Sequence, residues 1–480
     1  MPNKDLREWM IKAEELGEVQ RVEGAHWDIE LGAIVDLFQR KTGRPALLFN
    51  NIPGYPKNYR ILSNTLMSLG RIALTLEMPT ETKAVDMVKA WRELWPKLER
   101  IPPQEVSDGP VLENINTGDE INLLKFPVPK WHELDGGRYI GTGCLVIMRD
   151  PDTGWVNLGT YRVMVHDEKN AALYISPGKH GRIIREKYWK RGQACPVAIA
   201  CGQDPLLYFL SSVEIPYGWS EYDVAGAIRK EPVEVIKGPA TGLPIPASAE
   251  IVFEGEVRDD DRLDEGPFGE WTGYYGSGIR PEPVIRVKTV LHRNDPILLG
   301  APPQVPPCDV TFPRGLLRSG LIWDELEKAG VPGIQGVWAH EAGGSRLMLI
   351  IAIKQLYGGH SKQAGLIASQ CHAGAYANRL VVVVDEDIDP SDTNQVLWAI
   401  CTRSNPEEDV EIIRKCWSTP LDPMAYPPEL RIFNSRMVID ACRPWERLET
   451  FPPVATISQE LRQQIEAKWA YLFDAPYFRG

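Results

Sequence analysis

The chain has 480 residues, 43% of them hydrophobic, and a formal net charge of −12. This length is enough for two or three domains with cores of their own. The excess of acidic residues argues against nucleic acid or an anionic membrane surface as a partner. The longest apolar runs, such as Leu347–Ile353, are far shorter than the roughly 20 residues that cross a bilayer. Because Lys4, Asp5 and Arg7 stand where a signal peptide would be apolar, we expect a cytoplasmic protein.

The eight cysteines are scattered along the chain, and no two of them form a CxxC pair. This distribution predicts neither a disulfide framework nor a structural zinc site. We therefore expect reduced thiols, most of them packed in the interior.

Residues 1–110 are expected to form a small N-terminal α/β domain. Apolar residues at helical spacing predict helices over 5–16, 30–39 and 81–94. The run Ala46–Phe49 is short enough for a buried strand. The segment Ile101–Pro110 is rich in proline and polar residues, so we place a domain boundary there.

From residue 111 to residue 312, short or alternating apolar runs are separated by glycines, prolines and polar turns. The runs cover 139–148, 155–166, 171–175, 195–201, 250–257 and 284–291. They predict an antiparallel β domain, a barrel or a curled sheet, with helices near 181–190 and 222–229. The mouth of such a barrel is a common cofactor site.

Residues 313–450 alternate between helical and apolar segments. We expect helices over 316–328, 361–377 and 393–403 and strands over 346–354 and 380–384, a pattern typical of an α/β layered domain. The remaining residues, 451–480, contain a predicted helix over 458–473 with one apolar stripe: Leu461, Ile465, Trp469 and Leu472. Because the helix's own domain need not cover that stripe, we expect it to contact another subunit.

The segment Asp264–Gly276 reads DEGPFGEWTGYYG and places Glu265 and Glu270 five residues apart. Its glycines and proline disfavour helix and central strand, so we predict a loop with both carboxylates on one side. Two close carboxylates do not both ionise cheaply, and one retains a proton near neutral pH. Four aromatic residues accompany them, as in the wall of an organic substrate pocket: Phe268, Trp271, Tyr274 and Tyr275. The alternatives are a glycine-rich turn with solvated acids and a core position for Trp271.

Asn157 and Arg162 share one predicted strand, where Gly159 between them allows a bulge. Arg162 is flanked by tyrosine and valine, and a strand arginine in such surroundings requires a carboxylate partner if it is buried.

Three further polar residues lie next to predicted helix starts. Lys179-His180 occupies a turn of the kind that suits a phosphate, and Glu221 stands just before a helix. Together with Asn157 they offer an Asn, His and Glu ligand mixture that suits Mn²⁺ or Mg²⁺. Taken singly, Asn157 also fits a strand-end turn, His180 a helix entry and Glu221 an acid favoured by the helix dipole.

Taken in chain order, these motifs resemble the UbiD family of decarboxylases, which use prenylated FMN. The ordered set spans about 230 residues, which is far more specific than any one motif. Its elements are Asn157…Arg162, Lys179-His180, Ser211-Ser212…Glu221, Glu265–Glu270, Gly359–Lys362 and Asp385–Asp389.

The resemblance implies a cofactor site in a central split β-barrel of the flavin-reductase type. The cofactor phosphate would be anchored through a divalent ion, Mn²⁺ or Mg²⁺, held by Asn157, His180 and Glu221. A K⁺ ion would lie beside it, bound partly by backbone, at Leu210, Ser212, Val213 and Glu221. The resemblance implies these further cofactor contacts: Thr142, Gly159, Thr160, Arg162, Lys179, Ser211, Ser212 and Lys362.

Arg162, Glu265 and Glu270 occupy the positions of the family's catalytic Arg-Glu-Asp/Glu triad. By resemblance, the substrate acid adds covalently to prenylated FMN, which serves as the electron sink, CO₂ leaves, and Glu270 protonates the carbon. Arg162 would orient the substrate carboxylate and pair with Glu265. The reaction would be reversible, with an aromatic, heteroaromatic or α,β-unsaturated acid as substrate. Phe268 and Trp271 favour a flat ring.

The resemblance also implies a flavin prenyltransferase as cofactor supplier and a homo-oligomer, either a dimer or a hexamer. Some family members act on aromatic acyl-CoA thioesters, so such a substrate is an alternative. An FMN-dependent oxidoreductase is an alternative of another class, but no GxGxxG motif opens a βαβ unit for a nicotinamide donor. A non-catalytic flavin-binding subunit is disfavoured because both Glu265 and Glu270 are present.

Overall fold

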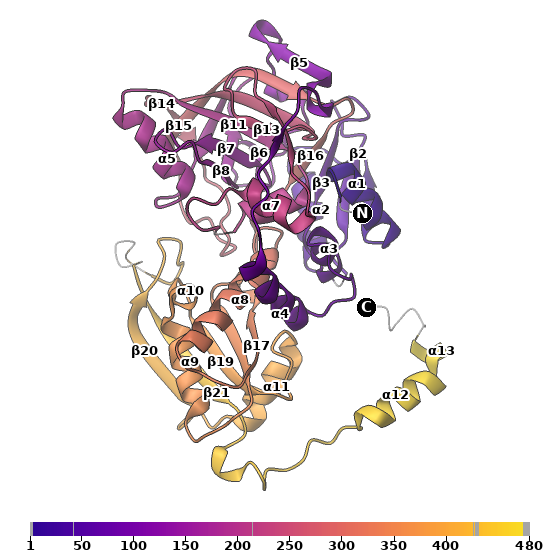
Figure 1. Cartoon of the computed structure of the whole chain (residues 1–480), viewed down its shortest axis with the longest axis vertical. Helices are drawn as coiled ribbons and strands as arrows, with labels where there is room; N and C mark the ends of the chain where they lie inside the picture. The colour runs from indigo at the N-terminus through magenta and orange to yellow at the C-terminus, as the bar shows by residue number, and fades with distance from the viewer. Residues whose placement is uncertain (1–2, 42, 214, 426, 428–431, 474–480) are drawn as a thin grey trace.

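The computed structural model describes residues 3–41, 43–213, 215–425, 427 and 432–473. Figure 1 shows two lobes, with the chain up to residue 300 largely in the upper one and the chain from α8 (Phe312–Lys328) onward in the lower one. Within the described residues, no helix is long and apolar enough to cross a membrane. No disulfide joins the eight cysteines, and all but Cys371 and Cys401 are buried.

The N-terminal region is a small α/β unit whose sheet takes a strand from much later in the chain. Its sheet order is β1-β2-β3-β16, and β16 pairs in parallel with β3. The helices expected over 5–16, 30–39 and 81–94 are present, and α1 is capped by the Asp5 side chain. The elements are α1 (Leu6–Glu15), β1 (Val19–Glu23), α2 (Glu30–Gln39), β2 (Ala46–Asn50), β3 (Arg60–Ser63), α3 (Leu69–Thr75), α4 (Ala84–Leu94) and β16 (Ile297–Gly300).

The central region is an antiparallel sheet of order β6-β9-β10-β15-β14-β11-β7-β8, with β5 beside β15. Two strands, β10 and β15, separate β9 from β14 in this order, yet Arg162 of β9 hydrogen-bonds Glu265 of β14. The sheet is therefore strongly curled, as expected from the short apolar runs. Its strands are β5 (Asn114–Thr117), β6 (Arg138–Gly141), β7 (Leu145–Arg149), β8 (Val156–Gly159), β9 (Arg162–Val165), β10 (Asn170–Tyr174), β11 (Cys195–Cys201), β14 (Ile251–Glu265) and β15 (Arg280–His292).

Three helices lie at the ends of these strands: α5 (His180–Lys190), α6 (Pro205–Ser211) and α7 (Glu221–Arg229). The segment expected to be a linker, 101–110, instead contributes β4 (Gln104–Glu105) to a small sheet with β12 (Glu234–Lys237) and β13 (Pro244–Pro246). Short 3-10 helices are η1 (Trp95–Lys97), η2 (Pro110–Glu113), η3 (Gly118–Glu120), η4 (Leu123–Lys125), η5 (Glu341–Gly343) and η7 (Trp445–Arg447).

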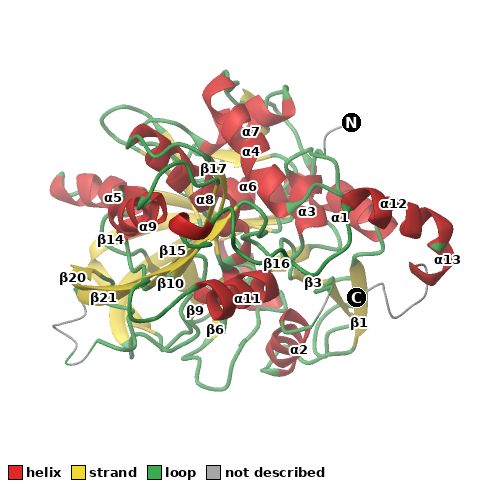
Figure 2. Ribbon diagram, turned by 90° about the horizontal axis from the view of Figure 1, so that it is seen from below, coloured by secondary structure: helices red, strands yellow, loops and turns green. Residues whose placement is uncertain are grey.

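The lower lobe is an α/β layered unit with sheet order β17-β18-β19-β21-β20. Neighbouring residues of β18 point to opposite faces of this sheet: Ile351 packs in the core with α8 and α9, and Ile350 packs in the core with α11. Helices therefore cover both faces of the sheet. Figure 2 shows α9 and α11 on opposite sides of it. The helix expected over 361–377 breaks where Cys371 is extended. The elements are β17 (Ile334–Ala339), β18 (Met348–Ile353), α9 (His360–Gln370), α10 (His372–Ala375), β19 (Leu380–Asp385), α11 (Thr393–Arg403), β20 (Val410–Trp417) and β21 (Phe433–Ala441).

The last described elements, α12 (Gln459–Lys468) and α13 (Ala470–Phe473), stand away from both lobes in Figure 1. No residue of α12 is buried, and its predicted apolar stripe is open to solvent.

Candidate active site

Arg162 joins the two acidic residues that the sequence singled out. Its Nη2 donates to Glu265 Oε2 at 2.7 Å and its Nη1 to Glu270 Oε1 at 3.0 Å. The three side chains are 9%, 0% and 14% exposed for Arg162, Glu265 and Glu270. Glu265 ends β14 and pairs with Arg280 at the start of β15, so the loop begins at Gly266, two residues later than predicted.

The buried end of this cluster is supported by Tyr139 and Phe268. Tyr139 on β6 donates its hydroxyl to Glu265 Oε1 at 3.0 Å, and its ring stacks on Phe268 with 3.8 Å between centroids. Phe268 is only 1% exposed. Its ring packs on Tyr139 and lies 5.7 Å from the Arg162 guanidinium, and its place in the substrate pocket stays a prediction.

The surroundings of Glu270 favour its protonated form. Burial raises the pKa of Glu270, and the nearby Glu265 carboxyl raises it further, whereas Arg162 and Arg280 lower it. The sequence predicted this direction from the proximity of the two acids, but burial is the larger cause. Burial and the Glu265 charge also raise the pKa of Tyr139, so its hydroxyl remains a hydrogen-bond donor.

Trp271 faces the lower lobe. It is 9% exposed, and the guanidinium of Arg346 lies 5.7 Å from its ring centroid. A Cβ on Gly344, which has φ +60°, would lie 2.9 Å from Trp271 Cε3 and 3.0 Å from its carbonyl oxygen. These contacts favour the alternative of a packed tryptophan, and a place for Trp271 in the substrate pocket stays a prediction.

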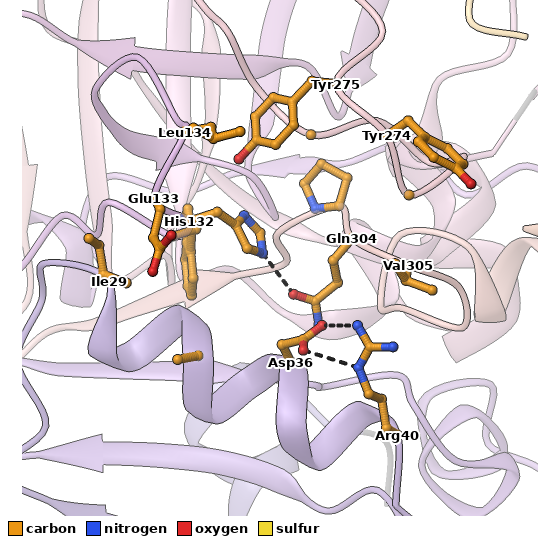
Figure 3. A pocket seen from close by; sticks show the side chains of 15 residues that line it. Ile29, Asp36, Arg40, His132, Glu133, Leu134, Tyr274, Tyr275, Gln304 and Val305 are labelled. Atoms are coloured by element: carbon orange, nitrogen blue, oxygen red, sulfur yellow. Dashed lines mark hydrogen bonds and ion pairs between the residues drawn. The ribbon is translucent and has the colours of Figure 1, made fainter. Parts of the chain in front are cut away.

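A cavity of about 350 Å³ lies behind the acid loop. Figure 3 shows its lining from α2, the turn at His132, the acid loop and the segment around Gln304. Tyr274 and Tyr275 line it, whereas Arg162, Glu265 and Glu270 do not. In its wall His132 Nε2 lies 3.0 Å from Gln304 Oε1. The cavity is therefore distinct from the acid cluster.

The acid loop is fixed to the turn at 132–137. The Gly136 amide donates to Pro267 O at 2.8 Å, and Tyr275 donates its hydroxyl to Asp135 Oδ1 at 3.0 Å. A Cβ on Gly136 would lie 1.9 Å from Gly266 O, so this approach requires glycine. The sequence analysis did not find this turn, because nothing in its composition links it to a loop more than a hundred residues away.

Asn157 and Glu221 meet in the upper lobe. Glu221 accepts hydrogen bonds from Asn157 Nδ2 at 3.0 Å and from the Leu158 amide at 2.7 Å. Glu221 is 3% exposed, and burial raises its pKa to about 8. Asn157 Oδ1 is buried with no hydrogen-bond partner among the described residues. A buried carboxyl with neutral donors beside an unsatisfied oxygen suits a cation.

His180 begins α5, which packs against β8, the strand of Asn157. Its ring lies against Trp155 and Tyr217 at centroid distances of 5.2 and 5.5 Å. No three His, Cys, Asp or Glu side chains converge in the part of the chain that the structure describes. The ligand set expected for the divalent ion contains only two residues of these four types, His180 and Glu221, because its third member is Asn157.

Tyr161 connects β8 to the start of α5, a link that the sequence analysis missed. The Gly181 amide donates to the Tyr161 hydroxyl at 3.2 Å. Cβ atoms on Gly159 and Gly181 would lie 2.3 and 2.7 Å from atoms of the Tyr161 ring. Gly159 therefore makes room for a ring and ends β8. Our expectation of one bulged strand was wrong, because Asn157 lies on β8 and Arg162 on β9.

Most of the other expected cofactor residues lie at the end of α6. Thr160 Oγ1 lies 2.8 Å from Ser211 Oγ, and the Thr160 amide donates to Ser211 O at 3.0 Å. Ser212 donates its hydroxyl to Phe209 O at 2.8 Å. The Val213 amide donates to Leu210 O, and Thr142 Oγ1 accepts from the Ala301 amide at 2.9 Å.

The two lysines expected to contact the cofactor, Lys179 and Lys362, lie in different lobes. Lys179 is exposed at the N-cap of α5. Lys362 on α9 donates to Glu411 Oε1 at 2.8 Å on β20, the edge strand of the lower lobe. Its position had been inferred from neighbouring helix residues alone. The two side chains of this ion pair are 47% and 45% exposed, and the contact of Lys362 with the cofactor stays a prediction.

Three contiguous stretches of the chain match 3-octaprenyl-4-hydroxybenzoate carboxy-lyase domains. They are the N-terminal domain over residues 12–91, the Rift-related domain over 104–306 and the C-terminal domain over 311–441. The chain belongs to the UbiD family. It is thus a carboxy-lyase of the UbiD type, as its motifs indicated.

Relatives of this UbiD protein match along nearly its whole length. It is 34% identical to a phenolic acid decarboxylase of Bacillus subtilis (strain 168), over 92% of this chain and 93% of the relative. It is 32% identical to a pyrrole-2-carboxylic acid decarboxylase of Pseudomonas aeruginosa, over 92% of each chain.

Solved UbiD-class structures share the fold. The vanillic acid decarboxylase of Sedimentibacter hydroxybenzoicus in open form superposes with a TM-score of 0.87 at 29% identity, over 99% of this chain and 100% of that one. An evolved dimeric form of HmfF from Pelotomaculum thermopropionicum, in complex with prenylated FMN, superposes with a TM-score of 0.81 at 27% identity, over 97% and 100%.

Proposed function

We propose that this UbiD protein reversibly decarboxylates an aromatic or heteroaromatic carboxylic acid with prenylated FMN as cofactor. The observation that carries the proposal is the bridge from Arg162 to Glu265 and Glu270, one cation bonded to two buried acids. The acids named for the two relatives, phenolic and heteroaromatic, support this substrate class. An α,β-unsaturated acid or an aromatic acyl-CoA thioester would use the same residues.

The residues around Asn157 fit a cofactor phosphate held through a divalent ion. Asn157 Oδ1 is unsatisfied, and Glu221 is buried without a positively charged hydrogen-bond partner among the described residues. With His180 they form a set rich in oxygen donors that suits Mn²⁺ or Mg²⁺. Lys179, next to His180 at the N-cap of α5, would add a positive charge for the phosphate. K⁺ would bind near the carbonyl groups at the end of α6.

When bound, prenylated FMN supplies the electron sink that loss of CO₂ from an sp² carbon requires and that no side chain provides. Arg162, always charged, binds the substrate carboxylate and orients it. Glu270, whose pKa is raised by burial, gives its proton to the carbon that has lost CO₂. Glu265, held by Tyr139 and Arg162, keeps that arginine in place.

We further propose the overall assembly from the architecture. The curled central sheet would be a split barrel of the flavin-reductase type within 111–312, between domains over 1–110 and 313–450. The exposed stripe of α12, Leu461, Ile465 and Trp469 at 38–43% exposure, would pack on a second copy of the chain, forming a dimer or a larger homo-oligomer. A flavin prenyltransferase would supply the cofactor.

The test is co-expression with a flavin prenyltransferase, followed by the absorbance spectrum and CO₂ release from a panel of phenolic, pyrrole and furan carboxylic acids. Glu270→Gln should keep the cofactor spectrum and lose about 10²- to 10⁴-fold in kcat, because it cannot donate the proton. Glu256→Gln, the same change at the surface of β14, is the control and should be active. Full activity of Glu270→Gln would remove this residue from its proposed role.

A further inference from the structure

A second arginine stands beside the acid cluster. Arg280 begins β15 and lies directly opposite Glu265 across the β14–β15 pair. Its guanidinium lies 4.0 Å from the ring centroid of Tyr174, and the Arg162 guanidinium lies 4.4 Å from the same ring. Tyr174 is itself the direct cross-strand partner of Arg162. Tyr174 therefore supports both cations, each by a cation–π contact.

The position of Arg280 is also fixed by an acid of its own. Glu282, two residues further along β15, has Oε1 3.0 Å from Arg280 Nε. The side chain of Glu282 is 14% exposed and that of Arg280 is 35% exposed, so this pair is more accessible to solvent than Glu265. Burial raises the pKa of Glu282, and Arg280 opposes that rise.

The charges around Glu265 and Glu270 show why a second arginine matters. Among the described residues, Arg162 is the cation paired with both carboxyls, so once Glu270 has lost its proton this single cation faces two negative charges. The charged groups that act on Glu270 are Arg162 from β9, Arg280 from β15 and Glu265 from β14. From the lower lobe, Arg346 reaches the neighbouring Trp271. From β6, the Tyr139 hydroxyl bonds Glu265.

We propose that Arg280 is a positioning residue for the proton transfer: held by Tyr174 and Glu282, it places a second positive charge near Glu270, so that this acid releases its proton readily. The inference rests on the proposed role of Glu270 as proton donor. Loss of the Arg280 charge would make Glu270 hold its proton more tightly, because an anion near fewer cations is less stable. Glu270 would then be a weaker donor that stays protonated to higher pH.

The first experiment measures Glu270 directly in the full-length protein purified without cofactor. Infrared spectra are recorded over a pH series, and the spectra of Glu270→Gln are subtracted to isolate the Glu270 carboxyl band. Three variants are compared with the parent, each with its own Glu270→Gln reference: Arg280→Gln, Arg280→Lys and Arg286→Gln. Arg286 lies on the same strand, and its guanidinium pairs with Asp261 at the surface, so it is the matched control for charge.

The titration midpoint should move to higher pH in Arg280→Gln and stay near the parent value in Arg280→Lys and Arg286→Gln. An unchanged midpoint in a folded Arg280→Gln protein overturns the proposal and leaves Arg280 a structural residue. If Arg280→Gln does not fold, Arg280→Met serves instead, because it removes the charge and leaves the Tyr174 ring, which also supports Arg162, in place. It should shift the midpoint in the same direction, and an unchanged midpoint there overturns the proposal equally.

The second experiment uses the cofactor-loaded enzyme. The alkaline limb of its kcat profile should move to higher pH in Arg280→Gln, so that the fraction of activity kept one pH unit above the parent midpoint rises at least about twofold. Maximal kcat should fall while KM changes little. If the infrared midpoint shifts but Glu270→Gln remains fully active, the proposed function fails while the electrostatic role of Arg280 stands.

Discussion

Replacing Gly344 with alanine tests whether the lower lobe holds the acid loop in place. Gly344 has φ +60°, which costs a non-glycine residue about 1–2 kcal/mol. The added Cβ would lie 2.9 Å from Trp271 Cε3 and 3.0 Å from the Trp271 carbonyl oxygen, and backbone does not give way easily. Overpacking of this kind costs about 1–3 kcal/mol more. Gly344→Ala should therefore destabilise the protein by about 2–5 kcal/mol.

The variant Gly330→Ala separates the cost of positive φ from the cost of overpacking. Gly330 also has positive φ, +84°, but a Cβ there would meet nothing within 4 Å. It should cost only the backbone contribution, about 1–2 kcal/mol. Urea unfolding followed by tryptophan fluorescence compares the two variants, and kcat is measured on each. Gly344→Ala should also lower kcat, because Trp271 adjoins Glu270, whereas Gly330→Ala should not. Equal losses of stability with unchanged kcat in both would refute the reasoning.

The remaining predictions concern the acids and the terminal helix. Because burial raises the pKa of Glu270 and only its protonated form donates, activity should persist above the usual carboxyl range and fall as pH rises through that pKa; a kcat profile without an alkaline limb contradicts this. Tyr139→Phe leaves buried Glu265 without one donor and should cost about 1–3 kcal/mol in urea unfolding, and an unchanged midpoint would show that this hydrogen bond is dispensable. Ile465→Glu on the exposed stripe of α12 should reduce the oligomer mass in light scattering, whereas Gln463→Glu, on the other face, should not; equal masses would exclude α12 from the interface.

The sequence predicted local structure well because each helix carries its own signal. The helix over Glu30–Gln39 has the bounds expected from apolar spacing alone. The prediction failed where a helix ends although its apolar pattern continues. The helix expected over 361–377 stops at Cys371, whose backbone is extended. The segment around Gln104 looked like a linker because proline and polar residues dominate it, but β12 pairs with it.

The convergence of Arg162 with Glu265 and Glu270 could be predicted in kind, since a buried strand arginine requires acids. The ordered motifs then indicated which acids these were. The roles of the aromatic residues could not be predicted. A ring next to an acid can face a substrate or a neighbouring strand, and Phe268 and Trp271 pack against Tyr139 and Gly344. No sequence pattern indicated a role for Arg280, because its place opposite Glu265 depends on the register of the β14–β15 pair, which tertiary contacts set.

The pairing of β16 with β3 affects how the chain acquires its structure during synthesis. Until Ile297–Gly300 has left the ribosome, one edge of the first sheet, along Arg60–Ser63, has no neighbour. Bare strand edges recruit other chains, so the nascent N-terminal region is exposed to misassembly throughout translation of the central sheet. A fragment ending near residue 110 would carry this unpaired edge permanently and should aggregate when it is produced alone.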